Sequence, residues 1–487
     1  MTKATAESRA GAVLYEELAE KVRMLIEQGV FRGGERIPSV RALSRQFKVS
    51  VTTVLGAYRL LEDRGLIKAR PQSGYYVNGK LPAVPTVPVI SRSALKPTSV
   101  SHSEISLSIL KAASRPGIIP LGAAVSNPEL LPIDRLNRML SSSCRQHRIQ
   151  SISYDAPPGC ERLRVQIARR SLTMGCSLAP EEIVTTAGCL EAVHLALRAT
   201  CRPGDVVAVE SPTYCNFLLL IEKLELRALE IPCHPTDGVS LDALRYAIEH
   251  HNLKACLFNL NFNNPIGSLM PEQNKKDLVA LLAEHDIPLI EDDLHGDLFF
   301  GQERPKTTRA YDRSGGVLLC SSFSKTLAPG YRVGWIAAGR YQAEVEQLKA
   351  VTSVSTSSPP QLAVADFLAN GGYDRHLRKL QRVYASQMAR MAESVGANFP
   401  AGTRVTRPAG GFVLWVELPA AIDALELYEE ALQAGISIAP GPIFSAKGKY
   451  RNCIRLNAAF WSAKIEQAIE QLGRLAARIS GSLREDT

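Results

Sequence analysis

The chain has 487 residues, of which 45% are hydrophobic and 22% charged, and its net charge is +9. This length exceeds one ordinary hydrophobic core and predicts more than one domain. The sequence has no apolar run of membrane-spanning length and no apolar signal core after Met1, which argues against a membrane protein and indicates a cytoplasmic one. Its 10 cysteines contain no CxxC pair and its 9 histidines form no metal-ligand pattern, so we expect reduced thiols and neither a disulfide-rich nor a zinc-binding protein.

Residues 13–77 carry the pattern of helices, a tight turn and a β-hairpin. The apolar residues of the first helix recur at helical spacing: Leu14, Leu18, Val22, Leu25 and Ile26. Ser39 and Ser50 are good N-caps for the next two helices. Residues 66–77 then alternate around a Ser-Gly turn that includes Gly74, which predicts a hairpin wing.

Positive charge is concentrated in this first part of the chain. Residues 1–80 hold 14 Lys and Arg against 8 Asp and Glu, and this +6 is two-thirds of the total charge. Charge alone fits a solvated basic bundle, but two short helices joined by a turn, followed by a wing, favour binding of double-stranded DNA. The residues expected to meet phosphates or base edges, or to shape the elements that do, are Arg36, Ser39, Arg41, Arg45, Ser50, Thr52, Thr53, Arg59 and Gly74.

This arrangement resembles the winged helix-turn-helix of the GntR family over about 65 residues. The sequence departs from the family pattern at Val51, where many members carry Arg after the capping serine. Residues 78–114 follow as an expected linker that contains Pro82, Pro85, Pro88 and Pro97. Proline at this density predicts an extended, semi-rigid tether, either free or packed on the larger domain.

Residues 115–480 form the second predicted domain, in which Lys325 is the most informative residue. It lies in the run Ser-Ser-Phe-Ser-Lys-Thr-Leu-Ala-Pro-Gly-Tyr-Arg (321–332), between apolar, strand-like segments. Such a lysine can form a Schiff base with the aldehyde of pyridoxal 5'-phosphate (PLP), while Ser322 and Arg332 hold the phosphate. A second run, Thr-Ala-Gly-Cys-Leu-Glu-Ala (186–192), opens a helix whose first amides, at Gly188, Cys189 and Leu190, suit a phosphate.

The second domain resembles the fold-type I PLP enzymes of the aspartate aminotransferase superfamily. The matching runs are Glu-Ser-Pro-Thr-Tyr (210–214), Asn-Phe-Asn-Asn-Pro-Ile-Gly (261–267), Leu-Ile-Glu-Asp-Asp-Leu-His (289–295) and Asn-Cys-Ile-Arg-Leu-Asn (452–457). The resemblance implies an α/β fold with a mostly parallel sheet and a smaller C-terminal α/β subdomain, placed after a small α+β winged helix-turn-helix. It implies these roles: Tyr214 stacks on the pyridine ring, Asn264 donates to the 3'-oxygen, Asp292 (or else Asp293) keeps the ring nitrogen protonated, and Arg455 binds an α-carboxylate.

Two departures from this family put catalysis in more doubt than cofactor binding. Many aminotransferases carry Tyr three residues after the pyridine-binding Asp, where this chain has His295. Histidine can still hydrogen-bond the 3'-oxygen, but its proton affinity differs. Cys189 and Leu190 stand where small polar residues commonly help to bind the phosphate.

The two halves together resemble the MocR subgroup of bacterial GntR regulators. This resemblance implies a head-to-tail homodimer with two DNA half-sites. The same resemblance implies that Tyr154, in the run Tyr-Asp-Ala-Pro-Pro-Gly (154–159), reaches the PLP phosphate of the neighbouring subunit. The alternative interpretation of Tyr154 is a core tyrosine before a turn. We expect a regulator, associated with the nucleoid, whose operator binding responds to PLP or to an amino-acid or amine effector. The rival function is an aminotransferase with an appended DNA-binding domain, with Lys325 as base and Asp292 as its electron-sink partner. A third is a catalytically dead scaffold, against which the intact pocket residues argue.

Overall fold

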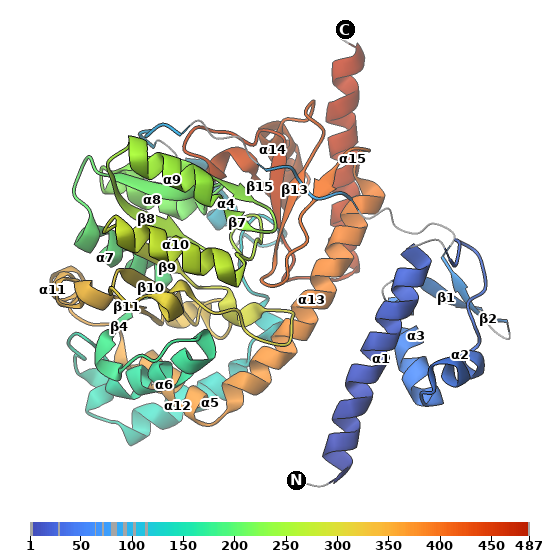
Figure 1. Ribbon diagram of the computed structural model, residues 1–487, viewed down its shortest axis with the longest axis horizontal. Coiled ribbons are helices and arrows are strands. Elements are labelled where there is room, and N and C mark those ends of the chain that lie inside the picture. The colour runs from blue at the N-terminus through green and yellow to red at the C-terminus, as the bar shows by residue number, and fades with distance from the viewer. Residues whose placement is uncertain are drawn as a thin grey trace. The chain divides into compact units, whose positions relative to one another are not determined.

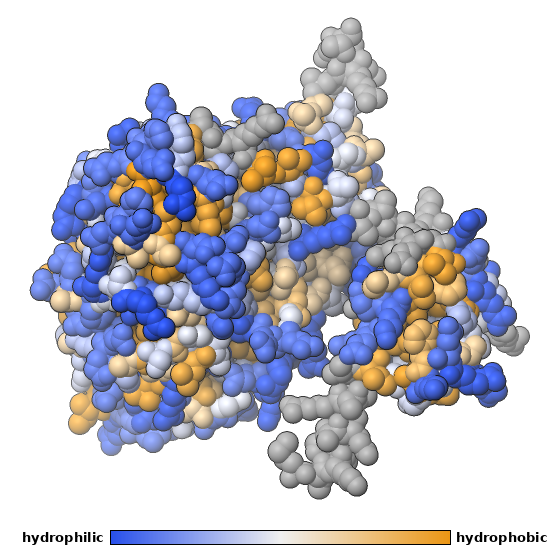
Figure 2. Space-filling model, in the orientation of Figure 1, coloured by the Kyte–Doolittle hydropathy of each residue, from blue (hydrophilic) through white to orange (hydrophobic). Residues whose placement is uncertain are grey.

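The computed structural model describes residues 3–27, 30–63, 65–70, 73–78, 85–90, 95–100, 104–112 and 115–485 (Figure 1). Pro82 of the expected linker lies outside these ranges. The chain divides into two compact units, Met1–Val84 and Pro85–Thr487. No helix among the described residues is long and apolar enough to cross a membrane. The visible face of the larger unit is mostly hydrophilic, with smaller apolar patches between the polar residues (Figure 2).

The first unit consists of three helices and a two-stranded wing. Its elements are α1 (Lys3–Glu27), α2 (Val40–Phe47), α3 (Val51–Asp63), β1 (Ile67–Arg70) and β2 (Gly74–Val77). Ser39 caps α2 by accepting from Ala42 N at 3.3 Å, and Ser50 accepts from Thr53 N at 3.0 Å at the start of α3. The strands pair antiparallel, with Ile67 opposite Val77, as the sequence alternation predicts. Leu18, Val22 and Ile26 of α1 pack in the core of this unit.

The second unit is built around an eight-stranded sheet with the order β4-β11-β10-β9-β8-β5-β6-β7. Strands β10, β9, β8, β5 and β6 are parallel to one another, whereas β11 and β7 are antiparallel to their neighbours. The strands are β4 (Ile183–Thr186), β5 (Val206–Ser211), β6 (Arg227–His234), β7 (Gly238–Val239), β8 (Leu253–Phe258), β9 (Leu289–Asp292), β10 (Val317–Ser322) and β11 (Gly334–Ala337).

Helices cover both faces of this sheet, so its strands are apolar on both sides. Val207 and Val209 of β5 pack with residues of α7 (Cys189–Thr200) and α8 (Cys215–Lys223). The alternate residues Val206 and Ala208 pack with α9 (Leu241–His250) and α10 (Glu272–Glu284). A further cluster lies against β4 and β11 and is enclosed by α5 (Ile133–Gln146), α6 (Glu161–Ser171) and α12 (Ser358–Ala369). Helix α11 (Gln342–Thr352) packs against α7 instead.

A smaller C-terminal subdomain has its own sheet, with the order β12-β13-β16-β15. These strands are β12 (Arg404–Val405), β13 (Val413–Glu417), β16 (Cys453–Asn457) and β15 (Ala439–Pro440). The accompanying elements are α13 (Gly372–Asn398), α14 (Ala424–Gln433), α15 (Ala463–Glu485) and the parallel pair β3 (Ile119–Pro120) and β14 (Ile436–Ser437). The mostly parallel sheet and this subdomain confirm the predicted fold class.

The described parts of residues 78–114, expected as a linker, lie on the larger unit from residue 85 onward. Thr86 O accepts from Val405 N at 3.0 Å, and Thr98 forms a bridge with Ala228. Residues 104–112 form a helix, α4 (Glu104–Ala112), instead of continuing the proline-rich segment. Burial of Ile109 in the C-terminal subdomain core holds α4 in place, a tertiary contact that the local sequence pattern did not reveal.

Candidate functional site

The ends of three neighbouring elements bring the predicted site residues together in the larger unit. Strand β9 ends at Asp292, β10 ends at Ser322, and α7 begins at Cys189 beside both strands. The loop that carries Lys325 follows β10. In open α/β sheets, ligands bind at the carboxyl ends of the parallel strands, and these residues occupy that edge.

Lys325 is half-buried, and its amine points toward the segment that follows β3. Its Nζ donates to the carbonyl of Ala124 at 2.5 Å, and Ser126 Oγ donates to the Lys325 backbone carbonyl at 2.7 Å. Burial, together with the nearby charge of Arg455, lowers the pKa of the Lys325 ammonium to about 8. The amine is therefore much closer to its nucleophilic, neutral form near neutral pH than an exposed lysine is.

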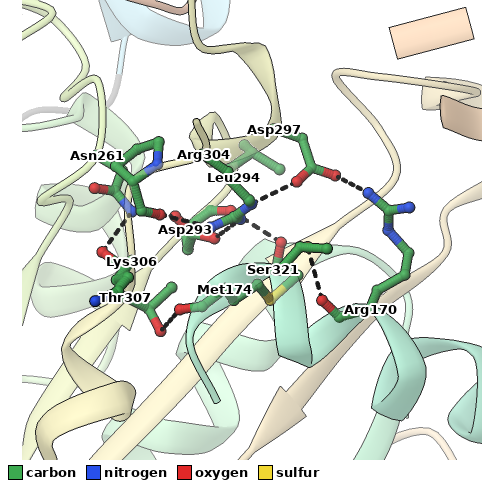
Figure 3. Close-up of polar contacts among 12 residues, drawn as sticks. Arg170, Met174, Asn261, Asp293, Leu294, Asp297, Arg304, Lys306, Thr307 and Ser321 are labelled. Carbon is green, nitrogen blue, oxygen red and sulfur yellow. Dashed lines mark hydrogen bonds and ion pairs between the residues drawn. The ribbon is translucent and has the colours of Figure 1, made fainter. Parts of the chain in front are cut away.

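The two adjacent carboxylates at the end of β9 have different partners. Asp292 Oδ1 accepts from Cys189 Sγ at 3.3 Å and from Leu294 N at 3.0 Å, and burial raises the pKa of its carboxyl to about 6. Asp293 instead accepts from Asn261 Nδ2 at 2.8 Å and forms an ion pair with Arg304 (Figure 3). Asp292 is the carboxylate that faces Lys325 and Cys189, whereas Asp293 is held by a structural network.

That network extends from Asp293 through Arg304 and Asp297 to Arg170 (Figure 3). Arg304 Nε donates to Asp297 Oδ1 at 2.6 Å, and Arg170 approaches Asp297 at 3.3 Å. Burial tends to raise the pKa of the Asp297 carboxyl, but the guanidinium groups of Arg304 and Arg170 lower it to about 2. The carboxylates of Asp293 and Asp297 are thus compensated by cations, and Asp292 lies outside this network.

Arg332, Ser322 and the first residues of α7 form a candidate anion site. Arg332 donates to Ser324 Oγ at 3.1 Å and to Ala187 O at 2.9 Å, and it has no carboxylate partner among the described residues. Gly188 precedes α7 with φ +93°, and a Cβ atom there would lie 2.3 Å from Arg332 Nη2. Only glycine lets the guanidinium lie this close to the helix start.

Cys189 and Leu190, the next two residues, contribute little polar side-chain surface to the anion site. The Cys189 thiol is buried and directed at Asp292, and Leu190 is partly exposed. Any contribution of these two residues to anion binding therefore comes from their backbone amides at the start of α7. Ser322 Oγ accepts from Ser324 N at 3.2 Å, so Ser324 joins the same turn.

Asn264 and Arg455 lie in direct contact although they are far apart in the sequence. Arg455 Nη1 donates to Asn264 Oδ1 at 2.9 Å, and Arg455 Nη2 donates to the carbonyl of Gly122. The Arg455 side chain is buried, its centre lies 5.0 Å from the Phe444 ring centroid, and burial lowers the pKa of its guanidinium. Its Nε has no hydrogen-bond partner among the described residues, which leaves one donor for a ligand.

Tyr214 and His295 supply two further rings. Tyr214 is half-buried immediately before α8, and its hydroxyl accepts from Asn216 Nδ2 at 2.9 Å. His295 is 1% exposed, with its ring edge-on to Phe412 at a centroid distance of 5.5 Å. Apart from a loose approach to the Phe262 backbone, its ring nitrogens have no hydrogen bond among the described residues. Burial, together with the charge of Lys325, lowers the pKa of His295 to about 3, so its ring is neutral at physiological pH.

A cavity of about 170 Å³ joins Lys325, Tyr214 and Arg455. Its other lining residues are Leu107, Ile109, Ala123, Ala124, Val125, Cys215, Asn216, Leu219 and Ile443. Tyr154 does not line this cavity. Its side chain is 82% exposed, so the interpretation of Tyr154 as a core tyrosine is wrong.

In the first unit, the predicted DNA-binding residues are exposed or partly exposed and gather around α2, α3 and the wing. Arg36, Arg41, Arg45 and Arg59 are exposed. Ser50 Oγ lies 2.7 Å from the hydroxyls of both Thr52 and Thr53 at the start of α3. Gly74, with φ +103°, lies against the Arg36 guanidinium, where a Cβ atom would be 3.3 Å from Arg36 Nε.

Sequence reasoning missed three contributors to the site in the larger unit. Ser324 contacts Arg332, Gly122 accepts from Arg455, and Leu107 of α4 lines the cavity. Ser324 lies within the lysine run and could have been included because of its hydroxyl. Gly122 and Leu107 give no local signal, since their roles depend on where the N-terminal segment of the larger unit packs.

Comparison with known proteins identifies both units. Residues 152–472 match the family "Aminotransferase class I and II", and residues 14–77 match "Bacterial regulatory proteins, gntR family". The chain is 41% identical to the HTH-type transcriptional regulator YdcR of Escherichia coli, with 95% of this chain and 98% of YdcR covered. It is 30% identical to the HTH-type transcriptional regulator NorG of Staphylococcus aureus, with 88% and 96% covered.

Solved aminotransferase structures share the fold of the larger unit. The multiple substrate aminotransferase of Thermococcus profundus superposes with a TM-score of 0.72 at 27% identity, over 79% of this chain and 96% of that one. The α-aminoadipate aminotransferase of Thermus thermophilus, solved with N-(5'-phosphopyridoxyl)-L-leucine, gives a TM-score of 0.72 at 27% identity, over 77% and 95%. This chain therefore belongs to the class I and II aminotransferase family and, because a GntR-type helix-turn-helix domain precedes its aminotransferase domain, to the MocR subgroup of the bacterial GntR regulators.

Proposed function

We propose that this protein is a PLP-binding transcriptional regulator whose binding to double-stranded operator DNA, through residues 13–77, responds to a ligand bound in residues 115–480. The observation that carries the proposal is the pair of cations at the edge of the sheet. Lys325 and Arg332 have no carboxylate partner in an ion pair among the described residues, and the charge of Lys325 acts on the nearby Asp292. An aldehyde that carries a phosphate and a basic ring nitrogen matches these three groups.

The remaining residues fit the same cofactor. Arg332, Ser322 and the amides of Gly188, Cys189 and Leu190 would hold the phosphate. Tyr214 would stack on the ring, Asp292 would hold a proton at the ring nitrogen, and Asn264 and His295 would contact the 3'-oxygen. His295 favours this assignment because its buried ring has no well-formed hydrogen bond to any of the residues that the structure describes. When bound, PLP supplies an aldehyde that condenses with amines and a ring that withdraws electrons.

The effector in this proposal is PLP itself or an amino compound whose carboxylate binds Arg455. Arg455 would exchange its contact with Asn264 for the carboxylate, which accepts two parallel N–H bonds. The regulator acts as a head-to-tail homodimer in the cytoplasm, on nucleoid DNA. The exposed Tyr154 would reach the partner subunit's cofactor. The effector changes operator binding only if its affinity differs between two arrangements of the dimer.

Transamination is a second candidate function that one observation favours. The pKa of Lys325, about 8, lies close to the pH at which a lysine serves as a general base, and Asp292 lies nearby as the electron-sink partner. An aminotransferase releases keto acid repeatedly when it is given two substrates, whereas a regulator changes its DNA binding. A measurement of repeated keto-acid release therefore distinguishes the two functions.

The decisive experiment measures fluorescence anisotropy with DNA from immediately upstream of this gene and with scrambled DNA, at fixed salt, with and without PLP. We expect tight binding to the upstream DNA that changes with PLP, and loss of that change in Lys325→Ala. Specific binding to the upstream DNA that does not change with PLP would show that PLP alone is not the effector. Equal weak binding to both DNAs, together with repeated keto-acid release, would replace the regulator by the aminotransferase.

A further inference from the structure

Most of the other side chains that line the cavity are apolar, and together they form its apolar wall. Leu107 and Ile109 come from α4, Leu219 from α8, and Ile443 from the short helix Gly441–Phe444. Lys325 and Arg455 are the only charged side chains among the described residues that line the cavity. The polar lining side chains Tyr214, Cys215 and Asn216 are neutral, and Asn216 is already engaged with the Tyr214 hydroxyl.

We propose that this wall selects an effector with one carboxylate and an uncharged, apolar side chain, and that Leu107 is a specificity-determining residue. This inference rests on the proposed function, because Arg455 would hold the carboxylate and Lys325 would mark the amine end. The unpartnered Nε of Arg455 leaves a donor for one carboxylate. The remainder of such a ligand then meets Leu107, Leu219 and Ile443.

Charged side chains are disfavoured at this wall for two different reasons. A second carboxylate would be buried without a cation beyond Arg455 and Lys325, and burial of an unpaired charge is strongly unfavourable. A second ammonium group would enter a cavity whose described charged side chains are both positive. An apolar side chain carries no charge to desolvate, and it would cover the apolar surfaces of Leu107 and Leu219. Removal of this apolar surface from water makes the free energy of binding more favourable.

Leu107 can be changed without disturbing the core. Its side chain is 51% exposed, whereas Ile109, on the same helix, is buried in the C-terminal subdomain core. Ser108 Oγ lies 3.0 Å from the Tyr428 hydroxyl, which gives α4 a second attachment. A substitution at Leu107 therefore alters the cavity wall while Ile109 and Ser108 keep the helix in place.

The test titrates L-leucine, L-aspartate and L-lysine into the full-length, PLP-loaded protein and follows the heat of binding and the absorbance of the bound cofactor. We expect leucine to bind roughly tenfold or more tightly than either charged amino acid. Leu107→Arg should reduce the leucine-to-aspartate affinity ratio by roughly tenfold or more, because it adds a cation to the wall. The matched control is Val351→Arg on α11, where the side chain is 79% exposed and outside the cavity lining, and it should leave the ratio unchanged.

Each outcome separates the inference from the function on which it rests. Equal binding of all three amino acids, an unchanged ratio in Leu107→Arg, or PLP uptake without a response to any of the three probes would overturn the inference alone. Failure of the unaltered protein to take up PLP would remove the proposed function and the inference with it. Thermal melts of both variants confirm that a lost response does not reflect unfolding.

Discussion

The thiol of Cys189, the first residue of α7, donates to Oδ1 of Asp292, the last residue of β9, across 3.3 Å. This contact joins the start of the candidate phosphate-binding helix to the carboxylate proposed for the ring nitrogen. The contact is neutral on the cysteine side, because burial raises the pKa of the Cys189 thiol well above its usual value. Among the described residues Asp292 is buried without an ion-pair partner, unlike Asp293 beside it.

Replacement of these two neighbouring carboxylates should have opposite effects on the cofactor-free protein. The pKa of Asp292 is raised from 3.8 to about 6, so its contribution to folding stability is lost as pH rises through that window. At pH 7, Asp292→Asn should raise the free energy of unfolding by up to about 3 kcal/mol and weaken PLP binding. The Asn Oδ1 can still accept from Cys189 and Leu294.

Asp293→Asn is the matched control, because it breaks the buried ion pair with Arg304. It should lower the free energy of unfolding by roughly 3–5 kcal/mol. Chemical denaturation of both cofactor-free variants at pH 7 measures the two effects. Destabilisation by Asp292→Asn of the same size would show that Asp292 is a structural residue like its neighbour.

The rate of covalent PLP attachment should rise with pH around a midpoint near 8, the pKa of Lys325. The neutral amine is the nucleophile, and its fraction falls about tenfold per pH unit below the pKa. The positive charge of Arg455 lowers the pKa of Lys325, and Arg455→Gln removes that charge. The midpoint of the rate profile of this variant should therefore lie at higher pH than that of the unaltered protein. Stopped-flow absorbance after mixing with PLP measures the profile, and a pH-independent rate would contradict this role of the amine.

Gly188→Ala should weaken PLP binding roughly tenfold or more, because its Cβ would displace the Arg332 guanidinium from its position 2.3 Å away. The backbone strain of a non-glycine residue at φ +93° adds about 1–3 kcal/mol to the cost of folding. Gly204→Ala is the control, because Gly204 has φ +89° but a Cβ atom there would meet nothing within 4 Å. Equal losses of PLP affinity in the two variants would attribute the effect to strain and not to Arg332.

Arg41→Ala should weaken binding to specific and scrambled DNA alike and reduce the slope of log affinity against log salt by about 0.9, as expected for one lost phosphate contact. Arg41 is exposed in the first turn of α2. Arg23→Ala on α1, where Arg23 is ion-paired with Glu20, is the control and should keep the slope of the unaltered protein. Anisotropy titrations at several salt concentrations measure both slopes. An unchanged slope in Arg41→Ala would remove Arg41 from the interface.

Local sequence patterns predicted several elements correctly because their causes lie within a few residues. The hydroxyls of Ser39 and Ser50 cap α2 and α3, and a serine placed before an apolar helix is enough to predict this. The alternation of residues 66–77 predicted the wing because the side-chain period of a strand is two. The lysine run likewise predicted a strand end followed by a loop that carries Lys325.

Other features of the site depend on contacts between distant segments. The choice between Asp292 and Asp293 required knowledge of where Cys189 and Arg304 lie, since adjacent carboxylates have the same local sequence. The contact of Asn264 with Arg455 spans 191 positions of the chain. The exposure of Tyr154 and the helical state of residues 104–112 also follow from packing that no short window contains.

The sequence by itself determined the two-part organisation, the fold of each part and the set of residues that could hold a phosphate, an amine and a ring nitrogen. Residue types and short spacings carry that information, because capping, strand alternation and strand-end chemistry are local. Only the tertiary structure decided which carboxylate stays uncompensated, which donors of Arg455 remain free and which apolar side chains enclose the cavity. These properties depend on burial and on neighbours brought together from distant parts of the chain. Burial and neighbouring charges together set the pKa values of Lys325, Asp292 and His295, and the side chains that line the cavity decide which ligands it can bind.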